Sequence, residues 1–173
     1  MLTVRQYEDS DYDVCRNRLW LQLTETHREL YNAPEIGGDD PGLTFDEHLT
    51  RVGPERLWVA ELDGTVVGLT GLIVGDISTA IEPESEIEPL VVDENARGQG
   101  IGSALVDFLK EYVPANGLPE LVVGTTGRNK LMLEFLKKQG FDTIGTVNFI
   151  LQENYSVQNW SDGAEISGVA FKV

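Results

Sequence analysis

The chain has 173 residues, of which 41% are hydrophobic, and its formal net charge at pH 7 is −16. This length and apolar content suit one globular domain with a substantial core. So acidic a chain repels nucleic acid and anionic membranes, and we expect neither as a partner. No run of about 18 apolar residues is present, so no transmembrane span is expected.

The acidity has two explanations that the sequence leaves open. A cleft lined with carboxylates would attract cationic amines, whereas a solvated acidic surface is typical of salt-adapted, halophilic proteins and says nothing about substrate. The first residues enter an expected strand rather than a signal peptide, and Cys15 is the single cysteine. These features favour a cytoplasmic enzyme without disulfides. His27 and His48 have no partner at metal-ligand spacing, so we expect no metal.

Hydrophobic periodicity and turn signals predict the elements in chain order. Ser10 is the expected cap of the first helix, Thr44 and Glu47 form a potential capping box for the second, and Asp63-Gly64 is a hairpin signal. The predicted elements are a strand at residues 2–5, helices at about 11–30 and 44–52, strands at 57–62, 65–74 and 86–92, a helix from 101 to about 113, a strand at 121–125 and a helix at 129–139.

A glycine-rich turn joins the strand at 86–92 to the helix that begins at Ile101. Alternate glycines leave backbone amides uncovered, a helix N-terminus adds orphan donors and partial positive charge, and an arginine supplies a permanent cation. These are features of a pyrophosphate site, formed by Arg97, Gly98, Gln99, Gly100, Ile101 and Gly102. A P-loop would need a following lysine, and a dinucleotide fingerprint a different glycine spacing. A tight turn without ligand is the remaining alternative.

Three motifs together resemble the GNAT superfamily of N-acetyltransferases. The first is Arg97-x-x-Gly100-x-Gly102 after a strand that ends in Leu90-Val91-Val92; the second is Asn129, then Phe135, then Gly140-Phe141; the third is the hairpin at 59–68. The resemblance implies an α/β fold with a central mixed, mostly antiparallel sheet of about seven strands flanked by helices and splayed at the cofactor cleft. Two strands at 142–146 and 148–153 would complete this sheet.

The same resemblance divides the chain into an acetyltransferase domain at residues 1–153 and a C-terminal extension at 154–173. The alternating Val169, Phe171 and Val173 make that extension an extra strand, an oligomer contact or a tail. A homodimer is the assembly that the family suggests.

The resemblance also implies a cofactor and a reaction. Acetyl-CoA would donate an acetyl group to a primary amine, on a small molecule or a protein, by direct attack in a ternary complex. The implied cofactor residues are Leu90, Val91, Val92, the six residues of the glycine turn and Asn129. Trp20 and Tyr31 lie in the segment that this family uses for the acceptor.

Glu88 and Glu86 are the candidate general bases, and Glu88 ranks slightly ahead of Glu86. A protonated amine must lose a proton before attack, and in family members with a glutamate base it lies in this strand. Both residues share parity with Leu90 and Val92, so we expect all four side chains on one face and mutually raised carboxyl pKa values. Pro89 cannot donate to a ladder and predicts a bulge or an edge strand. Either glutamate could instead be a solvated strand residue.

The chain departs from the family pattern at one position. Leu136 stands where the family often has a tyrosine that protonates the leaving thiolate. Tyr12, Tyr31, Tyr112 or Tyr155 could substitute, or coenzyme A could leave as a thiolate. The alternative function is therefore a catalytically silent domain that binds or senses acyl-CoA.

Overall fold

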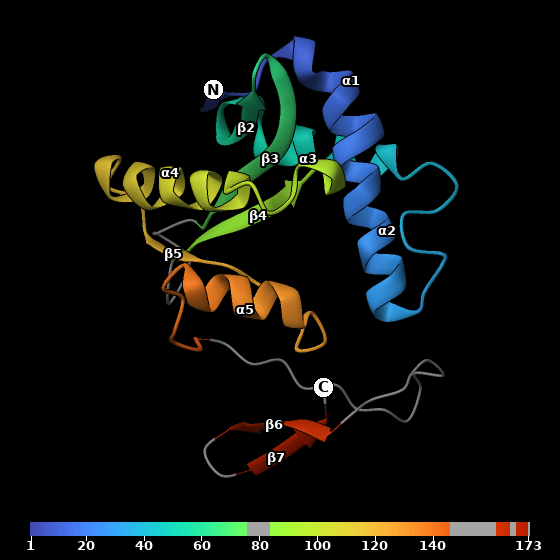
Figure 1. The fold of residues 1–173 in the computed structure, drawn as a ribbon, viewed down its shortest axis with the longest axis vertical. Helices are drawn as coiled ribbons and strands as arrows, with labels where there is room; N and C mark the ends of the chain where they lie inside the picture. Colours follow the sequence, from blue (N-terminus) through green and yellow to red (C-terminus); the bar gives the residue numbers. More distant parts are fainter. Residues whose placement is uncertain (76–83, 146–161, 167–168, 173) are drawn as a thin grey trace. The chain divides into compact units, whose positions relative to one another are not determined.

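The computed structural model describes residues 1–75, 84–145, 162–166 and 169–172 (Figure 1). It contains two compact units, the first formed by Met1–Thr26 with Glu35–Gly124 and the second by His27–Pro34 with Thr125–Val173. Each unit is described by itself. No helix within the described ranges is both long and apolar enough to cross a membrane.

The first unit is built on an open five-stranded mixed sheet. Its strands follow chain order across the sheet: β1 (Leu2–Gln6), β2 (Leu57–Leu62), β3 (Thr65–Val74), β4 (Glu84–Val92) and β5 (Glu120–Val122). Neighbouring strands are antiparallel except β4 and β5, which are parallel. The predicted GNAT-type sheet is thus confirmed in class, with five described strands in it rather than about seven.

Helices cover both faces of this sheet. The helical segments are η1 (Asp9–Asp11), α1 (Tyr12–Val14), the π-helical η2 (Cys15–Leu19), α2 (Trp20–Tyr31), α3 (Gly42–Val52), η3 (Pro54–Arg56), η4 (Glu94–Ala96) and α4 (Ile101–Ala115). On one face α4 buries Ile101 and Leu105 against Ala60. On the other, Leu19 and Phe45 pack with Leu69. The sheet therefore separates two apolar cores.

The hairpin between β2 and β3 forms where its sequence predicts it. Asp63 and Gly64 both have positive φ, 49° and 82°, as a two-residue type I′ turn requires. The caps of two helices differ from the prediction. Glu8 and Asp11 form the first capping box instead of Ser10, because the chain turns earlier into η1. The second helix begins at Gly42 rather than at Thr44.

A β-bulge interrupts the pairing of β3 with β4. Thr70 pairs with Leu90 but Leu72 pairs with Ile87, so Gly71 alone opposes two residues, Glu88 and Pro89. The bulge predicted from Pro89 is confirmed. A Cβ on Gly71 would collide with the Glu88 carbonyl oxygen and lie 2.6 Å from a Leu57 methyl. The bulge thus needs glycine on the facing strand.

The extra residue reverses the side-chain alternation along β4. Opposed residues of an antiparallel pair share a face, and Leu90 opposes Thr70 whereas Glu86 opposes Ile73. Leu90 and Val92 accordingly pack on the α4 core, while Ile73 packs on the other. The prediction that Glu86 and Glu88 share a face with Leu90 and Val92 is therefore wrong.

The second unit contains α5 (Lys130–Lys138) and an antiparallel hairpin of β6 (Asp162–Ile166) and β7 (Val169–Lys172). Both strands lie in the segment 154–173 that the sequence sets apart as an extension, and they form a sheet of their own. Residues 142–145 form no strand, so the strand predicted at 142–146 is wrong over its described part. The strand predicted at 148–153 lies outside the described residues.

Candidate functional site

β4 has an open edge in the second half of its length. Its parallel pairing with β5 begins at Glu84, opposite Glu120, and stops at Glu86, opposite Val122. In the described part of the chain, residues 87–92 pair with β3 only. The pairing stops because β5 itself ends at Val122, so main-chain groups in the rest of β4 face an edge without a neighbouring strand in the described part of the chain.

The hydrogen-bond pattern shows which peptide groups face that edge. The Asp93 amide donates to the Val67 carbonyl at 2.9 Å, so the flanking residues Val92 and Gly68 form a non-hydrogen-bonded pair. Peptide groups in such a pair point away from the partner strand, and the same holds two residues earlier at Leu90. Leu90 and Val92 thus present N–H and C=O groups to the open edge. Val91, which alternates with them, is buried in the core.

The glycine turn continues directly from this edge. Gly98 and Gly100 have φ values of 77° and 83°, and a Cβ at either would meet no atom within 4 Å. Gly100 is the N-cap of α4, whose first amides have no partner within the helix. The Arg97 Nε donates to the Val92 carbonyl at 3.2 Å, which holds this exposed cation beside the turn. The turn is open, cationic and rich in amide donors.

The residues that lead from β4 into the glycine turn are held by side chains of η2 and α2. The Arg18 Nε lies 3.1 Å from an oxygen of the buried Asp93 carboxylate, and Arg18 also donates to the Val66 carbonyl. The Gln22 side-chain oxygen accepts a hydrogen bond of 3.0 Å from the Glu94 amide. Arg18 of the π-helical segment and Gln22 of α2 therefore hold Asp93 and Glu94, the two residues that follow β4.

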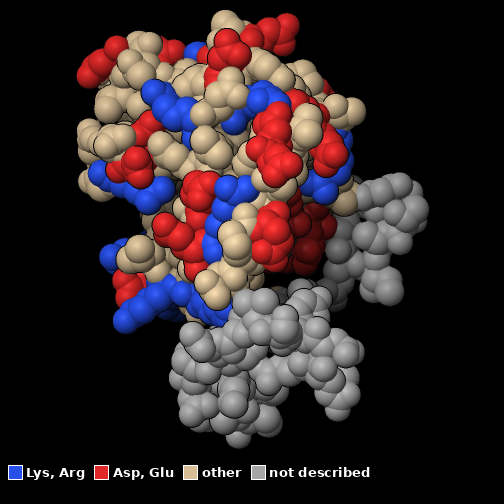
Figure 2. All heavy atoms as spheres, turned by 90° about the vertical axis from the view of Figure 1, so that its right-hand side faces the viewer, with Lys and Arg blue, Asp and Glu red and all other residues tan. Residues whose placement is uncertain are grey.

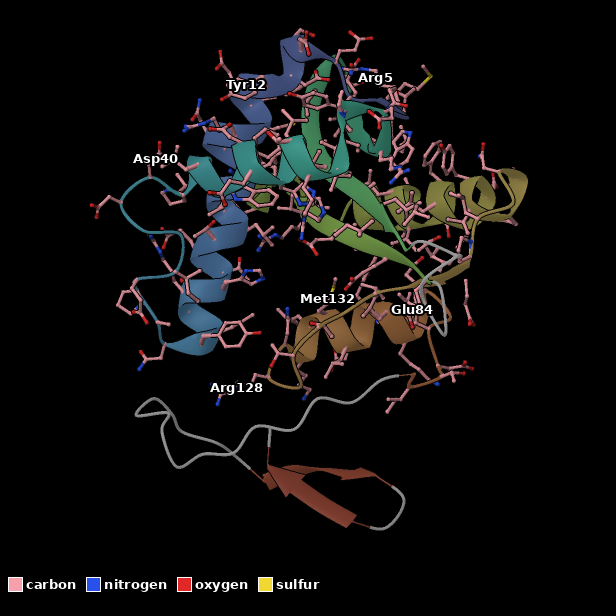
Figure 3. All side chains as sticks on the ribbon, turned by 180° about the vertical axis from the view of Figure 1, so that it is seen from behind. Arg5, Tyr12, Asp40, Glu84, Arg128 and Met132 are labelled. Atoms are coloured by element: carbon pink, nitrogen blue, oxygen red, sulfur yellow. The ribbon has the colours of Figure 1, made fainter. Side chains whose placement is uncertain are left out.

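The first half of β4 carries carboxylates toward α3. The Arg51 Nη2 donates to the Glu88 Oε1 at 2.9 Å, and the His48 Nδ1 lies 3.5 Å from the same oxygen. Glu86 lies beside Gly124, at which a Cβ would be 3.1 Å from the Glu86 Oε1. Glu84 begins the strand (Figure 3). A cluster of charged side chains thus adjoins the open edge.

These surroundings give the two candidate bases different acidities. Burial first, and then the charges of Glu88 and Glu84, raise the pKa of Glu86, against a smaller opposing effect of Arg51. The His48 imidazole first, and then Arg51, lower the pKa of Glu88, although burial opposes them. The expected mutual rise in pKa is therefore found for Glu86 and not for Glu88. These directions favour Glu86 as the proton acceptor near neutral pH, which reverses the order expected from the sequence, where Glu88 ranks first.

The structure places the remaining predicted residues as follows. Trp20 lies in the core, donates from Nε1 to the Thr44 hydroxyl at 2.7 Å, and packs against His48 with ring centroids 5.1 Å apart. Tyr31 is exposed at the end of α2 and contacts His27 edge to face. Asn129 caps α5, because its side-chain oxygen accepts from the Met132 amide at 3.1 Å. Tyr31 and Asn129 belong to the second unit, whereas the glycine turn belongs to the first.

Of the tyrosines proposed to replace the family's acid, Tyr12 has its hydroxyl engaged by another side chain. The Tyr12 hydroxyl donates to Asp46 at 2.7 Å, at the end of the first unit away from Glu84 (Figure 3). Tyr112 packs edge to face on Trp58, at a centroid distance of 4.7 Å. Tyr155 lies outside the described residues, and Leu136 is buried. Within the described ranges, no group of three or more metal-ligating side chains occurs.

Sequence reasoning missed His48, Arg51 and Gly71. His48 is only 3% exposed and faces Glu88, whereas the sequence treats it as an ordinary helix residue. Its spacing of three from Arg51 was the available signal, because residues i and i+3 share one face of a helix. Acidic side chains are otherwise spread over the surface with Lys and Arg between them (Figure 2).

Comparison with known proteins identifies the family to which this fold belongs. The family profile described as Acetyltransferase (GNAT) family matches residues 16–141. The chain therefore belongs to the GNAT acetyltransferase family.

Curated relatives match over part of their length. An uncharacterized N-acetyltransferase of Methanocaldococcus jannaschii is 38% identical over 91 residues, which cover 51% of this chain and 39% of that protein. Human N-acetyltransferase 8B is 33% identical over 88 residues, with the same two coverages. The matches thus span well under two thirds of these relatives.

Solved structures share the fold at low sequence identity. The aminoglycoside acetyltransferase AAC(6')-Iy, solved with a bisubstrate analogue of CoA, superposes with a TM-score of 0.61 at 17% identity, covering 87% of this chain and 97% of that one. A transcriptional regulator from Bacillus halodurans C-125 superposes at 0.64 with 20% identity, covering 87% and 100%. Proteins of different described roles therefore share this architecture.

Proposed function

We propose that the protein is an acetyl-CoA-dependent N-acetyltransferase that acetylates a primary amine by direct attack in a ternary complex. Membership of the GNAT family supports acetyl transfer. The observation that carries the proposal is the open edge of β4, where the peptide groups of Leu90 and Val92 lead straight into the glycine turn. An extended pantetheine arm can hydrogen-bond to such an edge as a strand would.

The glycine turn would hold the pyrophosphate of acetyl-CoA. The open positions at Gly98 and Gly100 let phosphate oxygens approach the main chain, and the start of α4 supplies amide donors and partial positive charge. Arg97 adds a full charge to a site whose surroundings are strongly acidic. Acetyl-CoA, when bound, supplies a thioester whose carbonyl carbon an amine can attack.

Glu86 would accept the proton that the amine must lose. As the nitrogen attacks, the C–N bond forms, the C–S bond breaks with its electron pair passing to sulfur, and the proton passes to the Glu86 carboxylate. Burial and neighbouring carboxylates raise the pKa of Glu86, which strengthens it as a base. Because a base works only when ionised, the rate falls as the pH drops through this raised pKa. The peptide N–H groups of Leu90 or Val92 can stabilise the oxyanion.

The leaving thiolate does not require a protein acid. An unperturbed thiol has a pKa of about 8.5, so coenzyme A can depart as a thiolate and take its proton from water. This agrees with a buried leucine at position 136, where no proton donor is available.

Two assays on the wild-type protein test the proposal. Calorimetric titration should show binding of acetyl-CoA, and a thiol-release assay should show turnover with at least one of ethylenediamine, spermidine, kanamycin or lysine ethyl ester. Binding without turnover on any amine would support the alternative, a silent acyl-CoA-binding domain. An absence of heat at millimolar acetyl-CoA would contradict both functions.

A further inference from the structure

α3 and β4 bring together three side chains that are far apart in the sequence. The Arg51 Nη2 lies 2.9 Å from the Glu88 Oε1 and 3.2 Å from the His48 Nδ1. The same His48 Nδ1 lies 3.5 Å from the Glu88 Oε1, so the imidazole adjoins both members of the ion pair. The Arg51 guanidinium thus contacts the buried His48 on its own helix and the Glu88 carboxylate on β4.

Burying the His48 imidazole at this position costs free energy. It is 3% exposed, it is packed against Trp20, and its buried Nε2 has no hydrogen-bond partner within the described part of the chain. Burying a polar group without a partner costs about 1–3 kcal/mol. Its other nitrogen, Nδ1, contacts both Arg51 and Glu88, and we assign the role of the imidazole to these contacts.

The β-bulge directs Glu88 to this pair. Gly71 alone faces Glu88 and Pro89, and the Thr70 hydroxyl donates to the Pro89 carbonyl at 3.0 Å. The backbone at the bulge is thus fixed from β3, and the Glu88 side chain reaches α3 from a fixed starting point.

In the described part of the chain, no ion pair of Glu86 with a cation corresponds to that of Glu88 with Arg51. The charged groups that act on it are Glu84 and Glu88 of its own strand and Arg51 of α3, while β3 presents Ile73 opposite it and β5 presents Val122. Two adjacent carboxylates in one environment would otherwise share their titration. Because Arg51 is bonded to only one of the two carboxylates, that of Glu88, the two differ in their pKa.

We propose that Arg51, supported by His48, is a positioning residue that engages Glu88 and so leaves Glu86 as the carboxylate that takes the proton of the acceptor amine. This rests on the proposed function for the role of Glu86, but the pairing itself can be tested without turnover. The side chain of Arg51 is 59% exposed and that of Glu88 is 43% exposed. Such an exposed pair contributes about 0–1 kcal/mol to stability, so its removal should leave the fold intact.

The experiment is a titration of glutamate side-chain carboxyl carbons by NMR, with the Glu86 signal assigned by its loss in Glu86→Gln. Arg51 lowers and Glu88 raises the pKa of Glu86. The midpoint of Glu86 should therefore move up in Arg51→Gln, down in Glu88→Gln, and return toward the wild-type value in Arg51→Lys. Arg56→Gln makes the same charge change at an exposed position and should not move it.

Two results would overturn the inference: a Glu86 midpoint that is unchanged in Arg51→Gln, or one that moves in the same direction in Arg51→Gln and Glu88→Gln. A merely structural role of Arg51 would not give opposite shifts with rescue by lysine. If the shifts occur but no amine is acetylated, the proposed function fails and the pairing stands. If amines are acetylated but the shifts are absent, the pairing alone fails.

Discussion

The two halves of β4 offer different chemical groups, main-chain peptide groups in one half and carboxylate side chains in the other. Beyond the bulge, Leu90 and Val92 and the turn that follows offer mainly peptide groups, and their side chains are packed on α4. Before the bulge, Glu86 and Glu88 offer side chains, whose properties depend on Arg51 and His48 of another element. A bulge of one residue separates the main-chain site, which we propose binds an anion, from the side-chain site, which we propose accepts a proton.

This difference predicts opposite sensitivities to mutation. The main-chain site should tolerate changes of most side chains but respond to changes in backbone conformation. The side-chain site should respond even to a substitution that keeps the shape and removes only the charge.

The largest effect should come from Glu86→Gln. The amide has the shape of the carboxylate but cannot accept the proton, so kcat/KM near neutral pH should fall about 10²–10⁴-fold. Thiol release with the best amine measures it, and Glu111→Gln on the exposed surface of α4 is the matched control. A rate equal to that of the control would show that Glu86 is not the base.

The bulge that separates the two sites should be sensitive to Gly71→Ala. The new Cβ would press on the Glu88 carbonyl and Leu57, so the free energy of unfolding should fall by about 1–3 kcal/mol. Urea denaturation measures this, and Gly145→Ala, with open space around its Cβ, is the control. An unchanged midpoint would mean that the backbone there shifts freely and that the bulge is not fixed by close packing.

A smaller effect is expected for Gly100→Ala in the turn. Its φ of 83° is strained for alanine, at a cost of about 1 kcal/mol, although the added methyl would meet no atom. The protein should therefore lose little stability but bind acetyl-CoA more weakly, because relief of the strain moves the amides of the turn. Calorimetry on this variant and on Gly145→Ala would show the difference; equal affinities would argue against a main-chain site.

The same comparison explains how much the sequence could predict. The glycine turn, the Asp63-Gly64 hairpin and the bulge at Pro89 are local, since each follows from the conformations that a few adjacent residues allow. The orientation of Glu86 relative to Leu90 required the register with β3, and a one-residue bulge reverses it. The partners of Glu88 lie on α3, at positions 48 and 51, and no local pattern in β4 indicates them.

The most direct test of the account is a paired titration of Arg97→Gln and Glu86→Gln with acetyl-CoA. If the turn binds the anion and Glu86 only handles the proton, Arg97→Gln should raise Kd about tenfold, since a charge-assisted contact is lost. Glu86→Gln should bind with the wild-type Kd. Wild-type affinity in Arg97→Gln, or a similar loss of affinity in both variants, would contradict the division of β4 into two sites.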